Sequence, residues 1–410
     1  MHNKFTIVAP ILTGHHATVQ DMLKPFGTIC PDTTPDSFGF AQIDTLHFAS
    51  LCIFNDVQDG WSLLFEHNID GQIEDHIDNL IAVAEALDGG AFLLELYNHC
   101  AGFDGQTLAA LRNYLLQHVI KPQAGFISAV GMSRDQIRLD ARVYDVVDAT
   151  LGAAGQPLAP ATAQAQVLDA LNGDPSVADW HSFPDPGIDL GLLGKLGATL
   201  SLLGNAIGFL VLAIINLPRE RAADQERARP DIDFQLSLAE NEDIIPTNHM
   251  LSVVYVHTDA GRQLAKRAAF GLLRTLVTLV FRKGFLGEID TIHFAHWSFC
   301  NDNRRLIFVS NYDGSWRSYL DDFTLKASNG LNLAWGHSVG YPKTWAMLKG
   351  GASNGPQFID FARRSMFPTL VWYSAYPSVS ATNIGRNRKL RAALIKARSG
   401  STDTSWLELV

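Results

Sequence analysis

Hydrophobic and polar positions along the chain follow two periods, and the order of those periods predicts the secondary structure. Alternation with a period of two indicates strands, and apolar residues spaced three and four apart indicate helices. In the C-terminal part the order is strand, helix, strand, strand, helix, strand, over 250–258, 260–281, 290–300, 304–312, 314–327 and 331–341. The N-terminal part predicts the same order over 4–11, 17–26, 45–54, 61–68, 71–87 and 91–99. A further helix, strand and helix follow in each part, over 107–119, 125–131 and 135–147 and over 356–366, 369–376 and 387–397. Each part therefore predicts a βαββαβ unit, the ferredoxin-like arrangement, with an extension.

The two parts also match each other residue by residue. The stretch "DTLHFA" at 44–49 matches "DTIHFA" at 290–295, and "HCAGF" at 99–103 matches "HSVGY" at 337–341. Asp70-Gly71 and Asp313-Gly314 fall at corresponding places between these stretches. We therefore predict an internal duplication that covers roughly 5–150 and 250–396.

A sheet of this kind carries helices on one face only, so another layer must cover its other face. A second copy of the unit is the simplest cover. The expected fold class is α+β, with two ferredoxin-like units packed sheet to sheet as an α/β barrel and an apolar helical insertion between them. The expected domains are 1–150, a linker region 151–245 that contains the apolar segment 190–217, 246–400, and a tail 401–410.

The insertion contains an uncharged stretch, 196–217, that is long enough to span a bilayer. A single crossing would put the two halves on opposite sides of the membrane, where they could not pack together. We therefore expect a hairpin or an interfacial segment, and the alternative is a buried core helix. Basic residues flank the apolar stretch 268–281, which suits anionic headgroups as well as ordinary solvated helix ends: Arg262, Lys266, Arg267, Arg282 and Lys283. The basic helix at 387–397 is a further candidate for the same surface.

The net charge of −10 argues against nucleic acid as a partner, because phosphate binding requires a basic surface. The four cysteines lie far apart without metal-site or disulfide spacing, which indicates a reducing compartment. The N-terminal residues predict a strand rather than a signal peptide. We expect a cytoplasmic protein with peripheral or monotopic membrane association.

The repeated stretches contain the residues that carry candidate chemistry. Alternation places His47 and His293 on the strand face away from the helices, where an imidazole can bind a metal or act as an acid or base. A histidine hydrogen-bonded within the core is the structural alternative. Asp70 and Asp313 stand between a strand and a helix, as expected for an N-cap or an Asp-Gly turn.

The duplicated topology resembles the dimeric α/β-barrel superfamily, over about three quarters of the chain. The superfamily includes chlorite dismutases and dye-decolorising peroxidases, both haem-binding, as well as monooxygenases and non-catalytic members. The stretches "HNIDG" at 67–71 and "SNYDG" at 310–314 are similar to the GxxDG motif of dye-decolorising peroxidases, except at the first glycine. In that motif the aspartate serves peroxide chemistry.

The resemblance implies haem as a cofactor, and the second half offers more candidate residues for it. The metal ligand is predicted to be His293. The cofactor-binding candidates are His293, His337, Trp297 and Trp335. The catalytic candidates are Asp313, Arg317 and His296.

Two functional hypotheses remain open. The first is a peroxidase-like, haem-dependent oxidoreductase that acts on a lipophilic substrate at a membrane surface. The second is a non-catalytic, membrane-associated protein that binds lipid or serves as a scaffold. The expected partners are a membrane lipid surface, a hydrophobic small molecule and, for a homo-oligomer, further copies of the chain.

Overall fold

A computed structural model describes residues 2–30, 36, 38–155, 158–182, 191–220, 238, 242–279 and 289–410. Within these ranges, 191–198, 218–220 and 278–279 are described by their backbone alone. The basic pair Arg282 and Lys283 lies outside the described residues. The chain has a mixed α+β fold, as the sequence predicts, with one mixed and one antiparallel large sheet.

The helices and strands divide between a first half, a middle region and a second half. The first half contains β1 (His2–Pro10), α1 (His16–Leu23), β2 (Gly27–Ile29), η1 (Phe40–Gln42), β3 (Leu46–Asp56), β4 (Gly60–Asp70), α2 (Ile73–Asp88), α3 (Ala91–Asn98), α4 (Leu108–Gln117), β5 (Val119–Ile120), β6 (Ala124–Ile127) and α5 (Arg134–Ala153). The middle contains α6 (Pro160–Gly173), η2 (Pro175–Val177) and α7 (Gly191–Glu220). The second half contains β7 (Thr247–Tyr255), α9 (Ala260–Leu279), β8 (Ile292–Cys300), β9 (Arg305–Asp313), α10 (Trp316–Lys326), α11 (Ser328–Trp335), β10 (Thr344–Trp345), β11 (Lys349–Gly350), η3 (Gly351–Ser353), α12 (Gly355–Ser365), β12 (Met366–Phe367), β13 (Thr369–Ser374), α13 (Ala381–Arg398) and η4 (Ser405–Leu409).

The two large sheets place corresponding strands at corresponding positions. The first sheet has the order β2-β13-β3-β4-β1-β5. The second, taken from its β6 edge, has the order β6-β8-β9-β7-β12, so the two orders match strand for strand apart from the additional β2. Neighbouring strands are antiparallel except β13 and β2. Neither sheet closes on itself within the described residues, so the expected barrel is not observed.

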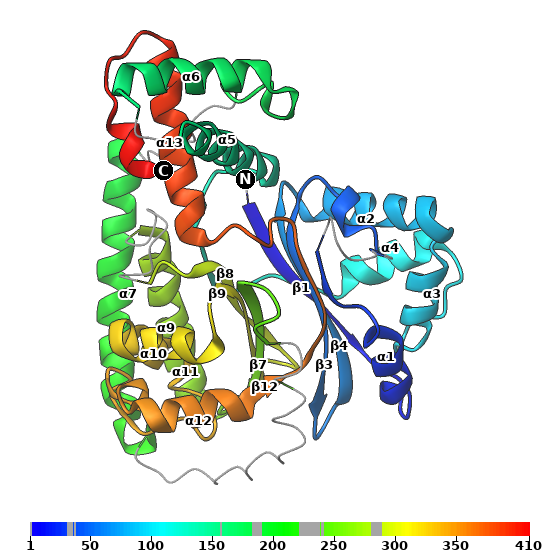
Figure 1. Cartoon of the computed structure of the whole chain (residues 1–410). Coiled ribbons are helices and arrows are strands. Elements are labelled where there is room, and N and C mark those ends of the chain that lie inside the picture. The colour runs from blue at the N-terminus through cyan, green and yellow to red at the C-terminus, as the bar shows by residue number, and fades with distance from the viewer. Residues whose placement is uncertain are drawn as a thin grey trace.

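Each half gives one strand to the other half's sheet. β6 pairs with β8, and β13 pairs with β3. In Figure 1 the orange β13 segment accordingly runs beside the blue strands of the first half. The two halves are therefore interlocked by backbone hydrogen bonds as well as by side-chain packing.

The inner faces of the two sheets pack against each other, and the helices lie outside them (Figure 1). Strands of both sheets contribute to one apolar cluster, formed by Val8, Cys52, Phe54, Leu64, Leu251, Val253, Cys300, Ile307 and Val309. A buried ion pair joins the sheets at one end, where Arg305 Nε lies 3.3 Å from Asp56 Oδ2. The alternating pattern of the strands produces this layer, because every second side chain faces the opposite sheet.

Two segments that the alternation predicted as strands are helices. The stretch 91–99 forms α3, with Leu93, Leu96 and Tyr97 buried. The stretch 331–341 contains the end of α11. Both predictions were wrong because short apolar runs fit either period, and the spacing of Leu93, Leu96 and Tyr97 is helical. The sheet edges that these segments were predicted to form are occupied instead by two-residue strands, β5 beside β1 in the first sheet and β12 beside β7 in the second.

The stretch predicted as the start of a linker, together with the C-terminal tail, forms a third packed region. α6 packs against α5, and α5 against α13, at the top of Figure 1. Trp180 and Trp406 are fully enclosed in the apolar cluster between these helices. Arg391 Nε lies 2.5 Å from Asp140 Oδ1 inside the same region. The basic helix α13 is thus held partly by internal contacts.

Candidate functional site

The repeated histidines each pair with the aspartate of the repeated Asp-Gly motif. His293 Nε2 lies 2.7 Å from Asp313 Oδ1, and His47 Nε2 lies 3.2 Å from Asp70 Oδ2. Both pairs lie at the ends of strands: the aspartates are the last residues of β4 and β9, and the histidines stand at the start of β3 and β8. A bulge beside each histidine accompanies the pairing.

The aspartates also fix the last helix of each half. Asp70 Oδ2 accepts the backbone N–H of Arg134 at 2.9 Å, and Asp313 Oδ2 accepts that of Ala381 at 2.7 Å. These are the first residues of α5 and α13, where backbone N–H groups lack helical partners. Gly314, with φ of 78°, turns the chain directly after the second aspartate. The duplicated motif therefore has a structural role in both halves.

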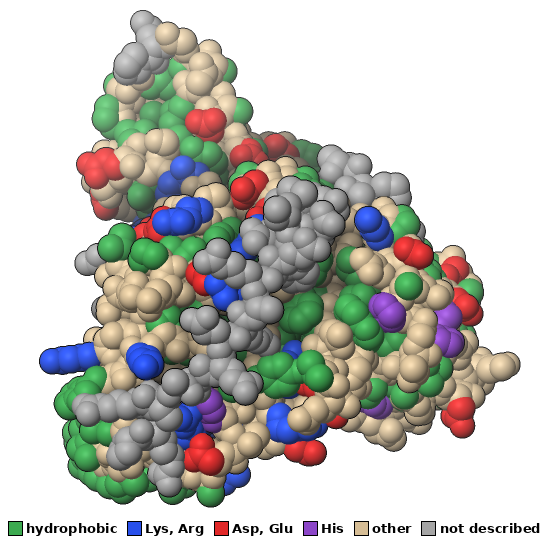
Figure 2. Space-filling model, turned by 90° about the horizontal axis from the view of Figure 1, so that it is seen from below, with side chains coloured by type: hydrophobic (Ala, Val, Ile, Leu, Met, Phe, Trp, Pro, Cys, Tyr) green, Lys and Arg blue, Asp and Glu red, His purple; other side chains and the backbone are tan. Residues whose placement is uncertain are grey.

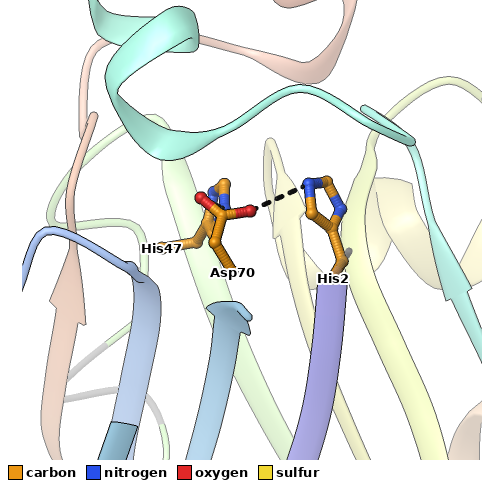
Figure 3. A group of neighbouring side chains, drawn as sticks. All are labelled: His2, His47 and Asp70. Atoms are coloured by element: carbon orange, nitrogen blue, oxygen red, sulfur yellow. Dashed lines mark ion pairs between the residues drawn. The ribbon is translucent and has the colours of Figure 1, made fainter. Parts of the chain in front are cut away.

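The first half adds a third polar side chain to its pair. His2 Nε2 lies 3.2 Å from Asp70 Oδ1, and the rings of His2 and His47 are 5.2 Å apart. Figure 3 shows the three side chains of His2, His47 and Asp70 pointing toward one another at the ends of neighbouring strands. In the second half Thr247 stands opposite Asp313, where His2 stands opposite Asp70. Of the two repeated pairs, the one in the first half thus brings two histidines and a carboxylate together.

The ionisation of this group follows from its surroundings. Burial alone would raise the pKa of Asp70, but its contacts with His2, His47 and the Arg134 N–H outweigh burial and hold that pKa well below its usual value. Burial lowers the pKa of His47, and the carboxylate of Asp70 opposes this effect only in part. Near neutral pH the group therefore contains an ionised carboxylate and a neutral His47.

A second polar cluster lies between the sheets. Glu66 Oε2 lies 3.1 Å from His249 Nε2, and the same oxygen accepts a hydrogen bond from Ser50 at 3.0 Å. Glu66 Oε1 accepts hydrogen bonds from Asn68 and Asn311. Burial would raise the pKa of Glu66, but the contacts with His249 and the amides outweigh it, so the pKa is lowered. This buried carboxylate is therefore fully hydrogen-bonded and joins the two sheets.

His296, a predicted catalytic residue, lies beside this cluster. It is fully buried, and neither ring nitrogen has a hydrogen-bond partner among the described residues. Burial lowers its pKa to about 4, although the nearby Glu66 charge opposes the change. The Lys4 side chain lies in the same region, and burial lowers its pKa to about 8. His296 is thus a neutral histidine in an enclosed layer.

The other predicted site residues do not gather around His293. Trp297 and Trp335 pack edge to face, with ring centres 5.5 Å apart, in the apolar core on the helix side of the second sheet. His337, which follows α11, donates from Nε2 to the Leu333 carbonyl of that helix at 3.1 Å, and burial lowers the pKa of His337 to about 3. Arg317 is two-thirds exposed and pairs with Asp321 one helical turn away. The second half therefore does not assemble the predicted site in one place.

Haem does not fit these residues as they are placed. His293 and His296 lie on the inner side of the second sheet, whereas Trp297 and Trp335 lie in the helix-side core. An apolar cavity in that core, lined by Trp335, Phe308 and Phe358 among others, has a volume of about 20 Å³. This is room for about one water molecule, whereas cofactor pockets have several hundred Å³. The same volume leaves no room there for a hydrophobic small molecule.

The apolar insertion forms a helix with an exposed hydrophobic face. In α7, the stretch Thr199–Leu217 is long and apolar enough to cross a membrane, and only 17% of it is buried. Seven aliphatic side chains on this stretch are 45–63% exposed: Leu200, Leu203, Ile207, Leu210, Val211, Ile214 and Ile215. Their spacing of three and four residues places them in one stripe along the helix. We call these seven residues the α7 outer face.

Two amide side chains of α7 point the other way, whereas Ser201 is exposed. Asn205 Nδ2 donates to Thr275 Oγ1 of α9 at 2.9 Å, and Asn216 is buried with its amide bonded to the Leu212 carbonyl. Small residues such as Ala213, Ala265 and Ala269 fill the contact between α7 and α9. Along this stretch α7 therefore has an apolar outer face and directs Asn205 and Asn216 inward, unlike a typical helix on a water-exposed surface.

Sequence reasoning missed His2, Glu66 and His249. Periodicity assigns a residue to a face of its own strand, but it does not reveal which strand lies opposite. His2 meets His47 only because β4 lies between β1 and β3, and His249 meets Glu66 only across the two sheets. The alternation of His2, Lys4 and Thr6 with Phe5 and Ile7 is the one signal that places His2 on a polar inner face.

Comparisons with protein-family models, with curated proteins and with solved structures found no match to this chain.

Proposed function

We propose that this chain is a monotopic membrane-associated protein that attaches to a lipid bilayer through the α7 outer face. The observation that carries the proposal is the stripe of seven half-exposed aliphatic side chains on a helix that directs Asn205 and Asn216 inward. Figure 2 shows hydrophobic side chains gathered at the lower left edge, on the side of the molecule where α7 runs in Figure 1. Transfer of each of the seven side chains into lipid gains on the order of 1 kcal/mol. The sum is enough for measurable attachment.

The helix lies in the plane of the membrane in this proposal. The interlocked β6 and β13 strands require both halves on the same side of the bilayer. A single crossing by α7 would separate them. The helix also packs along α9, which leaves one long face for the lipid. Arg267 is exposed on α9 and suits an anionic headgroup.

Flotation with liposomes tests the attachment. The full chain is mixed with vesicles of phosphatidylcholine containing about one third phosphatidylserine and centrifuged through a density gradient. We expect the chain to float with the vesicles, and the double variant Ile207→Glu/Ile214→Glu to remain at the bottom, because two charges on the stripe cost several kcal/mol in lipid. Both side chains are about 60% exposed, so the substitutions leave the core intact.

The matched control places the same two charges on other exposed apolar side chains. Val57 and Leu325 are 88% and 82% exposed, on the β3–β4 hairpin and on α10. Val57→Glu/Leu325→Glu should float like the parent. A parent chain that stays at the bottom of the gradient would refute the proposal. A second result would also refute it: light scattering shows a dimer for the parent and a monomer for Ile207→Glu/Ile214→Glu, while both float equally. A second copy of the chain would then cover the α7 outer face.

The strand orders support a duplicated origin for the two halves. We infer that each sheet derives from one ferredoxin-like unit and that the paired sheets are an open relative of the α/β barrel. The matching His–Asp pairs and helix contacts support this inference beyond strand order alone. Superposition of 5–150 on 250–396 that fails to align Asp70 with Asp313 would contradict it.

The peroxidase hypothesis stays a prediction from resemblance. No arrangement among the described residues favours it over the membrane-attachment proposal, since the predicted cofactor residues lie on two sides of a sheet. The absorbance spectrum of the full chain purified from cells supplied with haem is the direct measurement. A Soret band lost in His293→Ala but kept in His47→Ala would support the hypothesis, and its absence from the parent would oppose it.

A further inference from the structure

The group formed by His2, His47 and Asp70 has the composition and spacing of a metal site. One ligand atom from each residue can be chosen so that all three lie within 4.8 Å of one another. Each histidine Nε2 lies 3.2 Å from a carboxylate oxygen of Asp70. Around a tetrahedral zinc ion with bonds of about 2.0–2.2 Å, neighbouring ligand atoms lie about 3.4 Å apart. Small side-chain rotations therefore suffice to surround an ion.

The hydrogen bonds of this group leave polar atoms unsatisfied. His47 Nε2 is buried and makes no hydrogen bond to any described residue, although it faces the Asp70 carboxylate. His2 Nε2 has one proton at most, but it has two acceptors in reach, the Met132 carbonyl at 2.7 Å and Asp70 Oδ1. In the tautomer in which His47 Nδ1 donates its proton to Tyr376 Oη, Nε2 presents a lone pair to the Asp70 carboxylate, and a cation between them would satisfy both groups.

Second contacts hold the ligands in position. Tyr376 Oη lies 2.9 Å from His47 Nδ1, so the other ring nitrogen of His47 is directed toward Asp70. The Arg134 N–H holds one oxygen of Asp70. Such outer hydrogen bonds are typical of histidine and carboxylate ligands in metal sites. The Asp70 side chain is 18% exposed, which gives an ion access from solvent.

The corresponding pair in the second half has a different third residue. His293 makes a direct hydrogen bond to Asp313 at 2.7 Å, and Thr247 takes the place of His2. The Thr247 hydroxyl donates to the Pro377 carbonyl instead. The duplicated pair is thus common to both halves, and the third ligand is particular to the first half.

We propose that His2, His47 and Asp70 bind a divalent transition-metal ion, with zinc as the best match to two imidazoles and a carboxylate. Three protein ligands leave a fourth position for water, which is the composition of zinc sites that bind or activate a small molecule. The site is independent of the α7 outer face, so either proposal can fail alone.

The experiment uses the full chain without a polyhistidine tag. The protein is stripped with a chelator, dialysed against buffered zinc, and its metal content is measured by mass spectrometry. Affinity is measured by competition with a chromogenic chelator. We expect one tightly bound zinc per chain. His2→Thr, which introduces the residue of the second half, should weaken binding at least tenfold.

Reciprocal and surface variants distinguish this site from other histidines. Thr247→His should add a second zinc ion per chain, because it supplies the missing ligand to the His293–Asp313 pair. His15 and His99 approach within 2.8 Å near the surface and form a competing pair, so His15→Ala is the control that should leave the tight site unchanged. At the same zinc concentration, the melting temperature of the parent chain should rise more than that of His2→Thr.

Two results would overturn the proposal. One is a parent chain that binds no zinc at micromolar free concentration. The other is tight binding that persists in His2→Thr and is lost in His15→Ala, which would assign the ion to the surface pair. Circular dichroism of each variant verifies that a loss of binding does not reflect a loss of fold.

Discussion

Asp70 and Asp313 hold the same position in the two halves of the chain. Each is the last residue of a central strand, each lies beside a histidine, and each accepts the first backbone N–H of the helix that ends its half. The aspartate therefore joins three segments that are distant in sequence. This shared contact gives a structural reason for the repeated Asp-Gly motif.

Replacement of Asp313 by alanine should destabilise the fold. The change removes the partner of a buried histidine and a helix-terminal hydrogen bond, and the expected loss is about 2–4 kcal/mol of unfolding free energy. Urea denaturation followed by circular dichroism measures this loss. Asp321→Ala, which removes a surface partner of Arg317, is the control and should have little effect. Equal midpoints for the two variants would contradict the role of Asp313.

Removal of one partner from the buried ion pair of Arg391 and Asp140 should lower the free energy of unfolding, and replacement of both partners by apolar residues should restore most of it. Both side chains are about 98% buried, so the Arg391→Met change removes the guanidinium that faces the buried Asp140 carboxylate. Arg391→Met should cost about 3–5 kcal/mol, and the double variant Arg391→Met/Asp140→Leu should recover most of that loss. Unfolding free energies of the three proteins form the measurement. A double variant no more stable than Arg391→Met would show that packing, rather than charge, limits this region.

His337 should make the stability depend on pH. Burial lowers its pKa to about 3 in the folded chain, against about 6.5 when unfolded. Between these values only the unfolded chain binds the proton, so stability falls as pH decreases from about 6.5 toward 3. His337→Gln should reduce the slope of unfolding free energy against pH near pH 5 by up to about 1.4 kcal/mol per unit. The exposed His181→Gln serves as the control, and an unchanged slope in His337→Gln would contradict the prediction.

Three of the four cysteines should be unreactive in the folded chain. Burial raises the pKa of Cys52, Cys100 and Cys300 to about 12, so their reactive thiolate form is scarce at pH 8. Cys30 is only partly buried. With Ellman's reagent we expect Cys30 to react first and the other three after denaturation. Cys30→Ser should remove the early phase, and its persistence would assign that phase to one of the buried thiols.

The sequence predicted the local structure best where apolar periods are long. The central strands and the helices α2, α5 and α13 appear where the pattern placed them. The pattern failed for 91–98, where eight mostly apolar residues fit a strand as well as a helix. β5 and β12 are two residues long and too short for any period. The exchange of β6 and β13 between the halves also could not be predicted from the sequence, because alternation does not identify the partner of a strand.

The candidate site could be predicted only in part for a related reason. His47, His293, Asp70 and Asp313 were identified because the duplication repeats them. The pairing of each histidine with its aspartate depends on the register of β3 with β4 and of β8 with β9, which includes a bulge. His2 is not repeated, so self-similarity could not identify it. The most specific element of the proposed metal site is therefore the residue in which the halves differ.

The exchange of strands has a consequence for synthesis on the ribosome. β3 is complete at Asp56, but its neighbour β13 begins at Thr369, about 310 residues later. Synthesis proceeds at roughly 5–20 residues per second, so β3 lacks its partner strand β13 for on the order of 15–60 s. During this time the backbone groups of β3 on that side are open to wrong pairing. We therefore expect the nascent first half to keep this strand edge open until the C-terminal half completes the fold of both.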